Sequence, residues 1–179
     1  VVVRGNHDHY CATAEDLVGF HPLAADVVHW TRRQLKPEHI EFLKGLKYVM
    51  PVQSFTLVHS TLDNPEMWGY VFDKFEAEAH FNYQFSNVCF FGHTHVPLAF
   101  EKTGMDIKYG LYSKIKVTIG RKYFINVGSV GQPRDRDPRA AYVLYDLKAG
   151  EIVLRRVPYD VETAKRKILE AGMWPSLAA

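Results

Sequence analysis

The fold of this chain is decided by the stretch VCFFGHTH, residues 88–95, in which four apolar residues lead into a glycine and two histidines. The apolar run predicts a fully buried strand, because it is short and shows no polar alternation. Gly92 allows a sharp turn where this strand ends. We expect extended backbone beyond the turn, where i, i+2 spacing directs the imidazoles of His93 and His95 to one side and Thr94 to the other.

Two further polar clusters follow apolar segments in the same way. Asn6-His7-Asp8 comes after the β-branched run 1–3 and Gly5, and His59 comes after an apolar segment at 55–58. Open α/β sheets place ligand sites at the carboxyl ends of strands, and imidazole and amide donors suit Mn, Fe, Zn or Ni. Each cluster alone has an ordinary explanation as turn chemistry or a surface histidine. Their joint occurrence favours a metal site.

The alternation of expected strands and helices in the first half of the chain predicts an α/β fold. The run Val1–Val3 indicates a buried parallel strand. Apolar residues at helical spacing from Leu23 to Trp30 predict one short helix, and Pro37 opens a second. The other elements expected before residue 96 are a strand at 55–58, a helix from Asp73 to about Phe85, and the strand at 88–91.

After residue 96 the pattern changes to short β segments. We expect strands near 98–102, 112–118, 123–127, 142–147 and 152–157. Ala149-Gly150 predicts the turn between the last two strands. Asp160 is expected to cap a final helix that ends before Gly172. The expected fold class is therefore α/β, with antiparallel strands late in the chain.

Composition and charge narrow the function classes. The chain has 179 residues, of which 47% are hydrophobic and 23% charged, as in an ordinary single soluble domain. The net charge of +2 gives no strong nucleic-acid signal, and no apolar run is long enough to span a membrane. The basic cluster Lys114, Lys116, Arg121 and Lys122 is interpreted as a solvated hairpin edge. Two cysteines form no disulfide framework, which favours a reducing, cytoplasmic location.

The three polar clusters resemble the later signature blocks of the calcineurin-like metallophosphoesterase family: Gly-Asn-His-Asp, a single histidine after a strand, and Gly-His-x-His. A fourth block, residues 126–134, resembles the Asn-x-Gly-Ser segment of the small bacterial phosphodiesterase branch, which is grouped with diadenosine-tetraphosphatase-like sequences. The resemblance implies a metallophosphoesterase-type β-sandwich flanked by helices. It covers a domain at 1–159, which is followed by a C-terminal helix and tail at 160–179.

The resemblance also implies two divalent metal ions and assigns their ligands. Asn6, His59 and His93 are expected to bind one ion, and His95 the other. In general, two ions about 3.5–4 Å apart polarise phosphoryl oxygens and activate a shared water. The expected metals are Mn, Fe, Zn or Ni.

Three more residues receive roles near the substrate. The resemblance implies that His7 protonates the leaving oxygen and that Asp8 orients the His7 ring, in keeping with an imidazole that titrates near neutral pH. Arg134 could contact a substrate phosphate, although an arginine in such a loop is at least as often a surface ion-pair partner.

Two further blocks of the family pattern, Asp-x-His and Gly-Asp, have no match in this chain. We therefore expect the chain to lack two upstream βαβ units and to be inactive when isolated. One functional hypothesis is a phosphoesterase acting on phosphomonoesters or phosphodiesters, including nucleotides. The alternative is a catalytically incomplete, phosphoesterase-like scaffold that acts as an interaction module. The intact ligand set favours the first.

Substrate specificity is expected to lie in loops such as 63–70 and 105–112. Trp68 and Tyr70 in the first of these loops suit stacking on a base, but aromatic residues in a loop more often cover the core. The sequence leaves both alternatives open.

Overall fold

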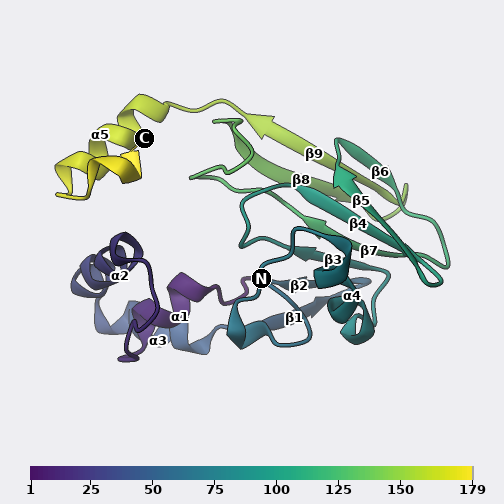
Figure 1. The fold of residues 1–179 in the computed structure, drawn as a ribbon, viewed down its shortest axis with the longest axis horizontal. Helices are drawn as coiled ribbons and strands as arrows, with labels where there is room; N and C mark the ends of the chain where they lie inside the picture. The colour runs from purple at the N-terminus through teal and green to yellow at the C-terminus, as the bar shows by residue number, and fades with distance from the viewer. Residues whose placement is uncertain (179) are drawn as a thin grey trace. The chain divides into compact units, whose positions relative to one another are not determined.

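A computed structural model describes residues 1–178, which divide into two compact units. The first unit holds residues 1–3 and 47–158, and the second holds residues 4–46 with the C-terminal segment that begins at Tyr159. Figure 1 labels the elements of both units. Among residues 1–178, no helix combines the length and apolar character that a membrane crossing requires.

The first unit is built on a six-stranded sheet with the strand order β1-β2-β3-β7-β4-β5. Its strands are β1 Val49–Val52, β2 Phe55–Val58, β3 Val88–Phe91, β4 Leu98–Thr103, β5 Asp106–Leu111 and β7 Lys122–Asn126. The three neighbours β2, β3 and β7 run parallel, whereas β1 and β4 pair antiparallel with β2 and β7. The residues that follow β2, β3 and β7 are therefore brought to one edge of the sheet.

A three-stranded antiparallel sheet packs on one face of the larger sheet. Its strands are β6 Lys114–Lys116, β8 Ala140–Asp146 and β9 Glu151–Val157, in the order β6-β9-β8. Ile152 of β9 joins Phe90 of β3 and Ile125 of β7 in one buried apolar cluster. Figure 1 shows the strands of the two sheets in two layers. The expected β-sandwich is confirmed.

Helix α4, Lys74–Tyr83, covers the other face of the large sheet. Its buried residues Ala77 and Phe81 share an apolar cluster with Phe91 and Phe124. The helix begins at a capping box, in which the Asp73 carboxylate accepts hydrogen bonds from the first turn and Glu76 bonds back to Asp73. The sequence pattern predicted a helix from Asp73 to about Phe85, and the helix is confirmed, with Asp73 as its cap and its end at Tyr83.

The second unit is helical. It contains α1 Asn6–Ala12, α2 Pro22–Gln34, α3 Pro37–Gly45, α5 Val161–Glu170 and the 3₁₀ turn η2 Pro175–Ala178. The predicted cap of α5 is confirmed, because the Asp160 side chain accepts a hydrogen bond of 2.9 Å from Thr163 N. Trp174 Nε1 donates to Asp26 Oδ2 at 2.8 Å and ties the C-terminal segment to α2. Helix α1 was not predicted, and it starts directly at the Asn-His-Asp cluster.

Val1–Val3 does not form the buried strand that the sequence predicted. Val1 is 83% exposed and Val2 53% exposed, and Val3 makes a single parallel bridge to Lys47. Strand β1 is an edge strand of the large sheet, and one bridge to the segment that leads into β1 is too little pairing to bury the run.

Two strands at the edges of the large sheet, β1 and β5, escaped prediction. Strand β1 contains Pro51, which weakens a strand pattern but is tolerated at an edge. Strand β5 is mostly exposed and carries charged residues, so its hydrophobic alternation is weak. The prediction of a loop at 105–112 is therefore wrong, because most of this segment is strand β5, which pairs with β4.

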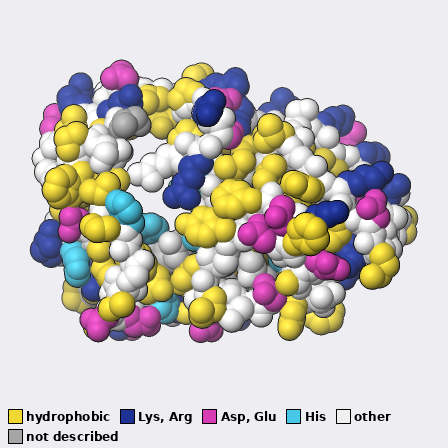
Figure 2. Space-filling view, in the orientation of Figure 1, with side chains coloured by type: hydrophobic (Ala, Val, Ile, Leu, Met, Phe, Trp, Pro, Cys, Tyr) yellow, Lys and Arg dark blue, Asp and Glu magenta, His cyan; other side chains and the backbone are white. Residues whose placement is uncertain are grey.

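Charged side chains are interspersed on the surface. Figure 2 shows Lys and Arg mixed with Asp and Glu over the face that it presents. Within the predicted basic cluster, Lys114 lies on the edge strand β6 and pairs with Glu151 at 3.0 Å, as expected of a solvated edge.

Candidate metal centre

The ends of β2 and β3 bring two histidines into contact. His59 directly follows β2, and its carbonyl accepts a 3.0 Å hydrogen bond from Gly92 N at the end of β3. His59 Nε2 then lies 3.2 Å from His93 Nδ1. Two imidazole nitrogens bound to one ion at about 2.1 Å, with an angle of about 90–110°, stand about 3.0–3.4 Å apart. The pair therefore fits part of a metal site, and the ligand role of each histidine stays a prediction.

The backbone around these histidines is not extended, so the sequence prediction for this loop is wrong. His93 and His95 have φ angles of 61° and 59°, in the left-handed region, and Thr94 N donates to Gly92 O at 2.7 Å. This tight turn, rather than i, i+2 alternation, sets the direction of the two rings. Left-handed backbone costs a residue other than glycine roughly 1–2 kcal/mol, so the surrounding structure must hold the turn in place.

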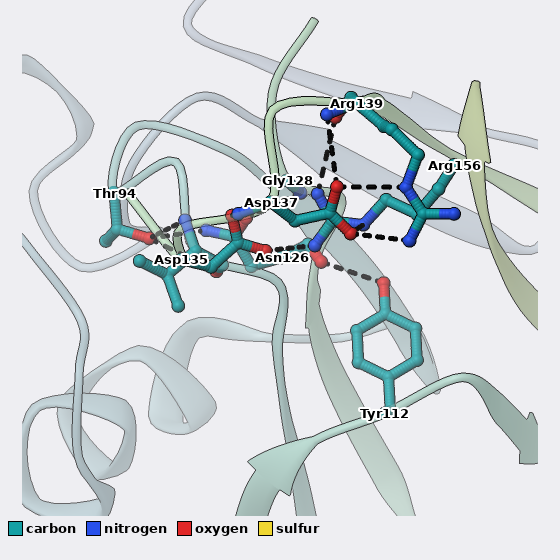
Figure 3. Close-up of polar contacts among 9 residues, drawn as sticks. Thr94, Tyr112, Asn126, Gly128, Asp135, Asp137, Arg139 and Arg156 are labelled. Atoms are coloured by element: carbon teal, nitrogen blue, oxygen red, sulfur yellow. Dashed lines mark hydrogen bonds and ion pairs between the residues drawn. The ribbon is translucent and has the colours of Figure 1, made fainter. Parts of the chain in front are cut away.

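Asn126, at the end of β7, is the residue that holds the turn (Figure 3). It is completely buried, and its Nδ2 donates to Gly92 O at 2.6 Å and to Thr94 Oγ1 at 2.9 Å. Its Oδ1 accepts from Gly128 N at 2.8 Å. Sequence reasoning assigned no role to Asn126, although its place in the fourth block at a strand end was the available signal.

Tyr112 completes this arrangement from the segment before β6. Its hydroxyl donates to the backbone carbonyl of Asn126 at 2.8 Å, as Figure 3 shows. Burial raises the pKa of Tyr112, so the hydroxyl stays protonated and remains a donor throughout the physiological range.

The ring of His95 has a defined tautomer. Its Nδ1 lies 2.8 Å from the backbone carbonyl of Gln132, and a carbonyl can only accept, so the proton is on Nδ1. The lone pair is then on Nε2. Histidines that bind metals commonly donate their other ring N–H to a carbonyl in this way. The His95 tautomer therefore suits a metal ligand, and that role stays a prediction.

The loop 131–139 that contacts His95 is fixed by ion pairs (Figure 3). The Asp135 carboxylate pairs with Arg156 of β9, and Asp137 pairs with Arg139 at 2.7 Å. Hydrogen bonds from Arg139 hold the pKa of the Asp137 carboxyl below its usual value. Arg134 is exposed and makes no ion pair with any of the described residues, so the surface ion-pair alternative is not observed. Its contact with substrate stays a prediction.

The cluster Asn6-His7-Asp8 forms the first turn of α1 in the second unit. Asp8 Oδ2 accepts a 2.8 Å hydrogen bond from Gly5 N, so this carboxylate caps the helix. The predicted roles of Asn6, His7 and Asp8 in metal binding and catalysis stay predictions. Within residues 1–178, no group of three His, Cys, Asp or Glu side chains gathers as a metal-ligand set.

His80 of α4 is a buried histidine with a structural role. Its Nδ1 accepts from Leu62 N at 3.1 Å, its Nε2 lies 3.2 Å from Gln84 Oε1, and its ring stacks on Phe124. Burial lowers the pKa of His80 to about 3. The neutral ring therefore anchors the start of the loop that leads from β2 to α4.

We expect the free energy of unfolding to fall in acid because of His80. Its pKa is about 6.5 in the unfolded chain and about 3 in the fold, so protonation below pH 6.5 favours the unfolded state. The stabilising contribution of the neutral His80 ring is fully present above pH 6.5. As the pH falls from 6.5 toward 3, the free energy of unfolding decreases by about 1.4 kcal/mol per pH unit at most. When the free energy of unfolding is measured with urea at several pH values between 7 and 4, it should fall less steeply with decreasing pH for His80→Gln than for the wild type. Parallel pH profiles would contradict the expectation.

Comparisons with known proteins show that the fold is that of a phosphoesterase family. Residues 1–150 match the calcineurin-like phosphoesterase superfamily domain, so the chain belongs to this family. It is 33% identical over 172 residues to an uncharacterized protein of Methanocaldococcus jannaschii, covering 94% of this chain and 69% of that protein.

Two solved structures share the fold. A metallophosphoesterase from Sphaerobacter thermophilus superimposes with a TM-score of 0.84 and 34% identity, over 98% of this chain and 73% of that one. A hypothetical protein from Pyrococcus horikoshii superimposes with a TM-score of 0.73 over 98% of this chain and 69% of that one, at 17% identity, which shows the fold alone. A phosphoesterase-type function is supported, and divalent metals are the usual cofactors of the family.

Proposed function

We propose that this protein is a metal-dependent phosphoesterase that hydrolyses phosphomonoesters or phosphodiesters. The observation that carries the proposal is the pair of ring nitrogens of His59 and His93, 3.2 Å apart at the carboxyl edge of parallel strands. Ligand sites of open α/β sheets lie at this edge. The membership of the chain in a phosphoesterase family supports the same conclusion.

The donor set suits Mn, Fe, Zn or Ni. His59 and His93 would hold one ion together with Asn6, and His95 would contribute to a second through Nε2. When bound, such ions polarise phosphate oxygens and make water a better nucleophile at neutral pH. The ligands named here are neutral, so no carboxylate among them offsets the charge of two divalent ions. We therefore expect the isolated chain to bind metal weakly and to have low activity.

The remaining polar side chains are proposed to act on the substrate itself. His7 would give its proton to the leaving oxygen, because histidine is the side chain that most often serves as a general acid in enzymes. Asp8 would orient the His7 ring in addition to capping α1. Arg134 would contact a phosphate oxygen through its guanidinium, which makes strong charge-assisted hydrogen bonds to such oxygens.

The test is a metal-dependence assay. The chain is freed of metal with a chelator, loaded with increasing Mn, Fe, Zn or Ni, and given p-nitrophenyl phosphate and bis(p-nitrophenyl) phosphate. We expect slow hydrolysis of at least one ester, which rises with metal concentration and disappears with excess chelator. The Sphaerobacter thermophilus metallophosphoesterase is assayed under the same conditions for comparison. Metal binding without hydrolysis of either ester would instead favour the incomplete, scaffold-like alternative.

A further inference from the structure

The loop 61–73 carries aromatic rings past the histidine pair. The Tyr70 ring lies 4.3 Å from the His93 ring, measured between centroids. The Phe72 ring is stacked beside Tyr70, with centroids 5.8 Å apart and planes 9° apart. We call Tyr70 and Phe72 the aromatic shelf. The shelf extends outward from the candidate metal centre.

The aromatic shelf does not cover the core. Val71, between the two rings, is buried and belongs to the apolar cluster beneath α4. Tyr70 and Phe72 are each 45% exposed and lie outside that cluster. Val71 is buried between two half-exposed neighbours, so both rings present a face to solvent. Two large half-exposed rings side by side, next to a polar site, form an apolar surface that is suited to binding a planar ligand.

Hydrogen bonds fix both ends of the loop. At its start, Leu62 N donates to the buried His80, and the Ser60 hydroxyl donates to the Pro65 carbonyl at 3.2 Å. At its end, Phe72 N donates to Glu76 Oε2 at 2.6 Å within the cap of α4. The rings are therefore held in place before any ligand arrives, which lowers the entropic cost of binding one.

We infer that the aromatic shelf binds the planar ring of the substrate, such as a nucleobase, and so selects nucleotides among phosphate esters. The inference rests on the proposed function, because it places the substrate phosphate at His59 and His93. Exposed aromatic rings stack on bases without regard to base identity, since every base has a π-face. The 4.3 Å contact between Tyr70 and His93 puts the shelf within reach of a group esterified to that phosphate.

The kinetic test compares adenosine 5′-monophosphate with ribose 5-phosphate, which has the same ester but lacks the base. We expect kcat/KM to favour the nucleotide by about 10-fold or more, mainly through KM. The double variant Tyr70→Leu, Phe72→Leu keeps apolar bulk and should bring the ratio of kcat/KM between the two esters down to about 1. The matched control is Phe85→Leu, which removes a ring that is 97% exposed outside this loop. Equal kcat/KM for the two esters in the wild type, or a preference that survives the double variant, would overturn the inference.

A binding test separates the shelf from the proposed chemistry. Adenosine itself has no phosphate, so its contact with the shelf needs neither metal nor hydrolysis. Saturation-transfer NMR should show signals from the adenine protons with wild type and with Phe85→Leu, and none with the double variant. Thermal unfolding checks that each variant is folded. If the adenine signals are seen but neither ester is hydrolysed, the proposed function is contradicted and the inference about the aromatic shelf stands. If the wild type gives no adenine signals, the inference that the shelf binds a planar ring is overturned.

Discussion

In a complete enzyme, with the Asp-x-His and Gly-Asp blocks present, replacing His7 with alanine is expected to lower the turnover number by about 10²–10⁴-fold, the usual contribution of a general acid. The reason is the charge that develops on the leaving oxygen, which needs a proton when the departing alcohol is weakly acidic. Asn6, the neighbouring residue, is the proposed metal ligand, so the variant should keep its metal content. The loss should shrink for aryl esters with acidic leaving groups, because these depart without protonation.

A series of aryl and alkyl phosphates of rising leaving-group pKa, measured with metal content per chain, tests this role. The control is His29→Ala, which removes an exposed histidine of α2 in the same unit. It should change neither turnover nor metal content. An equal loss of turnover for every leaving group, or loss of metal from His7→Ala, would show that His7 is not the proton donor.

The chain is expected to lose about 2–5 kcal/mol of unfolding free energy when Gly128 is replaced with alanine. Gly128 has a φ of +75°, and an added Cβ would lie 2.6 Å from Ala141 Cβ of β8. Left-handed backbone costs alanine roughly 1–2 kcal/mol, and overpacking a buried contact costs typically 1–3 kcal/mol more. Gly128 N also donates to Asn126, so relief of the clash would disturb the residue that holds the histidine turn.

Two glycines provide matched controls for Gly128→Ala. Gly104 has a φ of +58° with no atom within 4 Å of its added Cβ, so Gly104→Ala isolates the backbone cost. Gly131 has the same open space without a positive φ, so Gly131→Ala should be nearly neutral. Urea unfolding should rank the variants with Gly128→Ala least stable, then Gly104→Ala, then Gly131→Ala. Similar stability for Gly128→Ala and Gly104→Ala would mean that the contact with Ala141 relaxes at little cost.

The buried parts of the fold could be predicted from the sequence because buried positions are occupied by apolar residues in a recognisable pattern. The run 88–91 is strand β3 at the predicted bounds, and α4 begins within one residue of its predicted start at Asp73. The edge strands β1 and β5 show a weaker apolar pattern, because much of each strand is exposed. Pro51 also interrupts the pattern of β1. The Val1–Val3 run shows the opposite error, an apolar segment that stays largely exposed.

The candidate site was predictable in its residue types but not in its geometry. Strand ends and histidine chemistry pointed to His59 and His93, which the structure brings to 3.2 Å. The left-handed backbone at His93 and His95 could not be inferred from the residue type, because positive φ is uncommon for any residue other than glycine. It depends on Asn126, more than 30 residues further along the chain, and local sequence patterns do not report such distant partners.

Strand β7 lies between β3 and β4 in the sheet, although it follows both in the chain. During synthesis, the loop with His93 therefore leaves the ribosome before the strand whose Asn126 shapes it. Pairing of Val88 with Tyr123 is a distant contact, and such contacts form late in folding because a long loop must close first. We therefore expect the backbone turn at His93 and His95 to take its direction only when β7 pairs with β3.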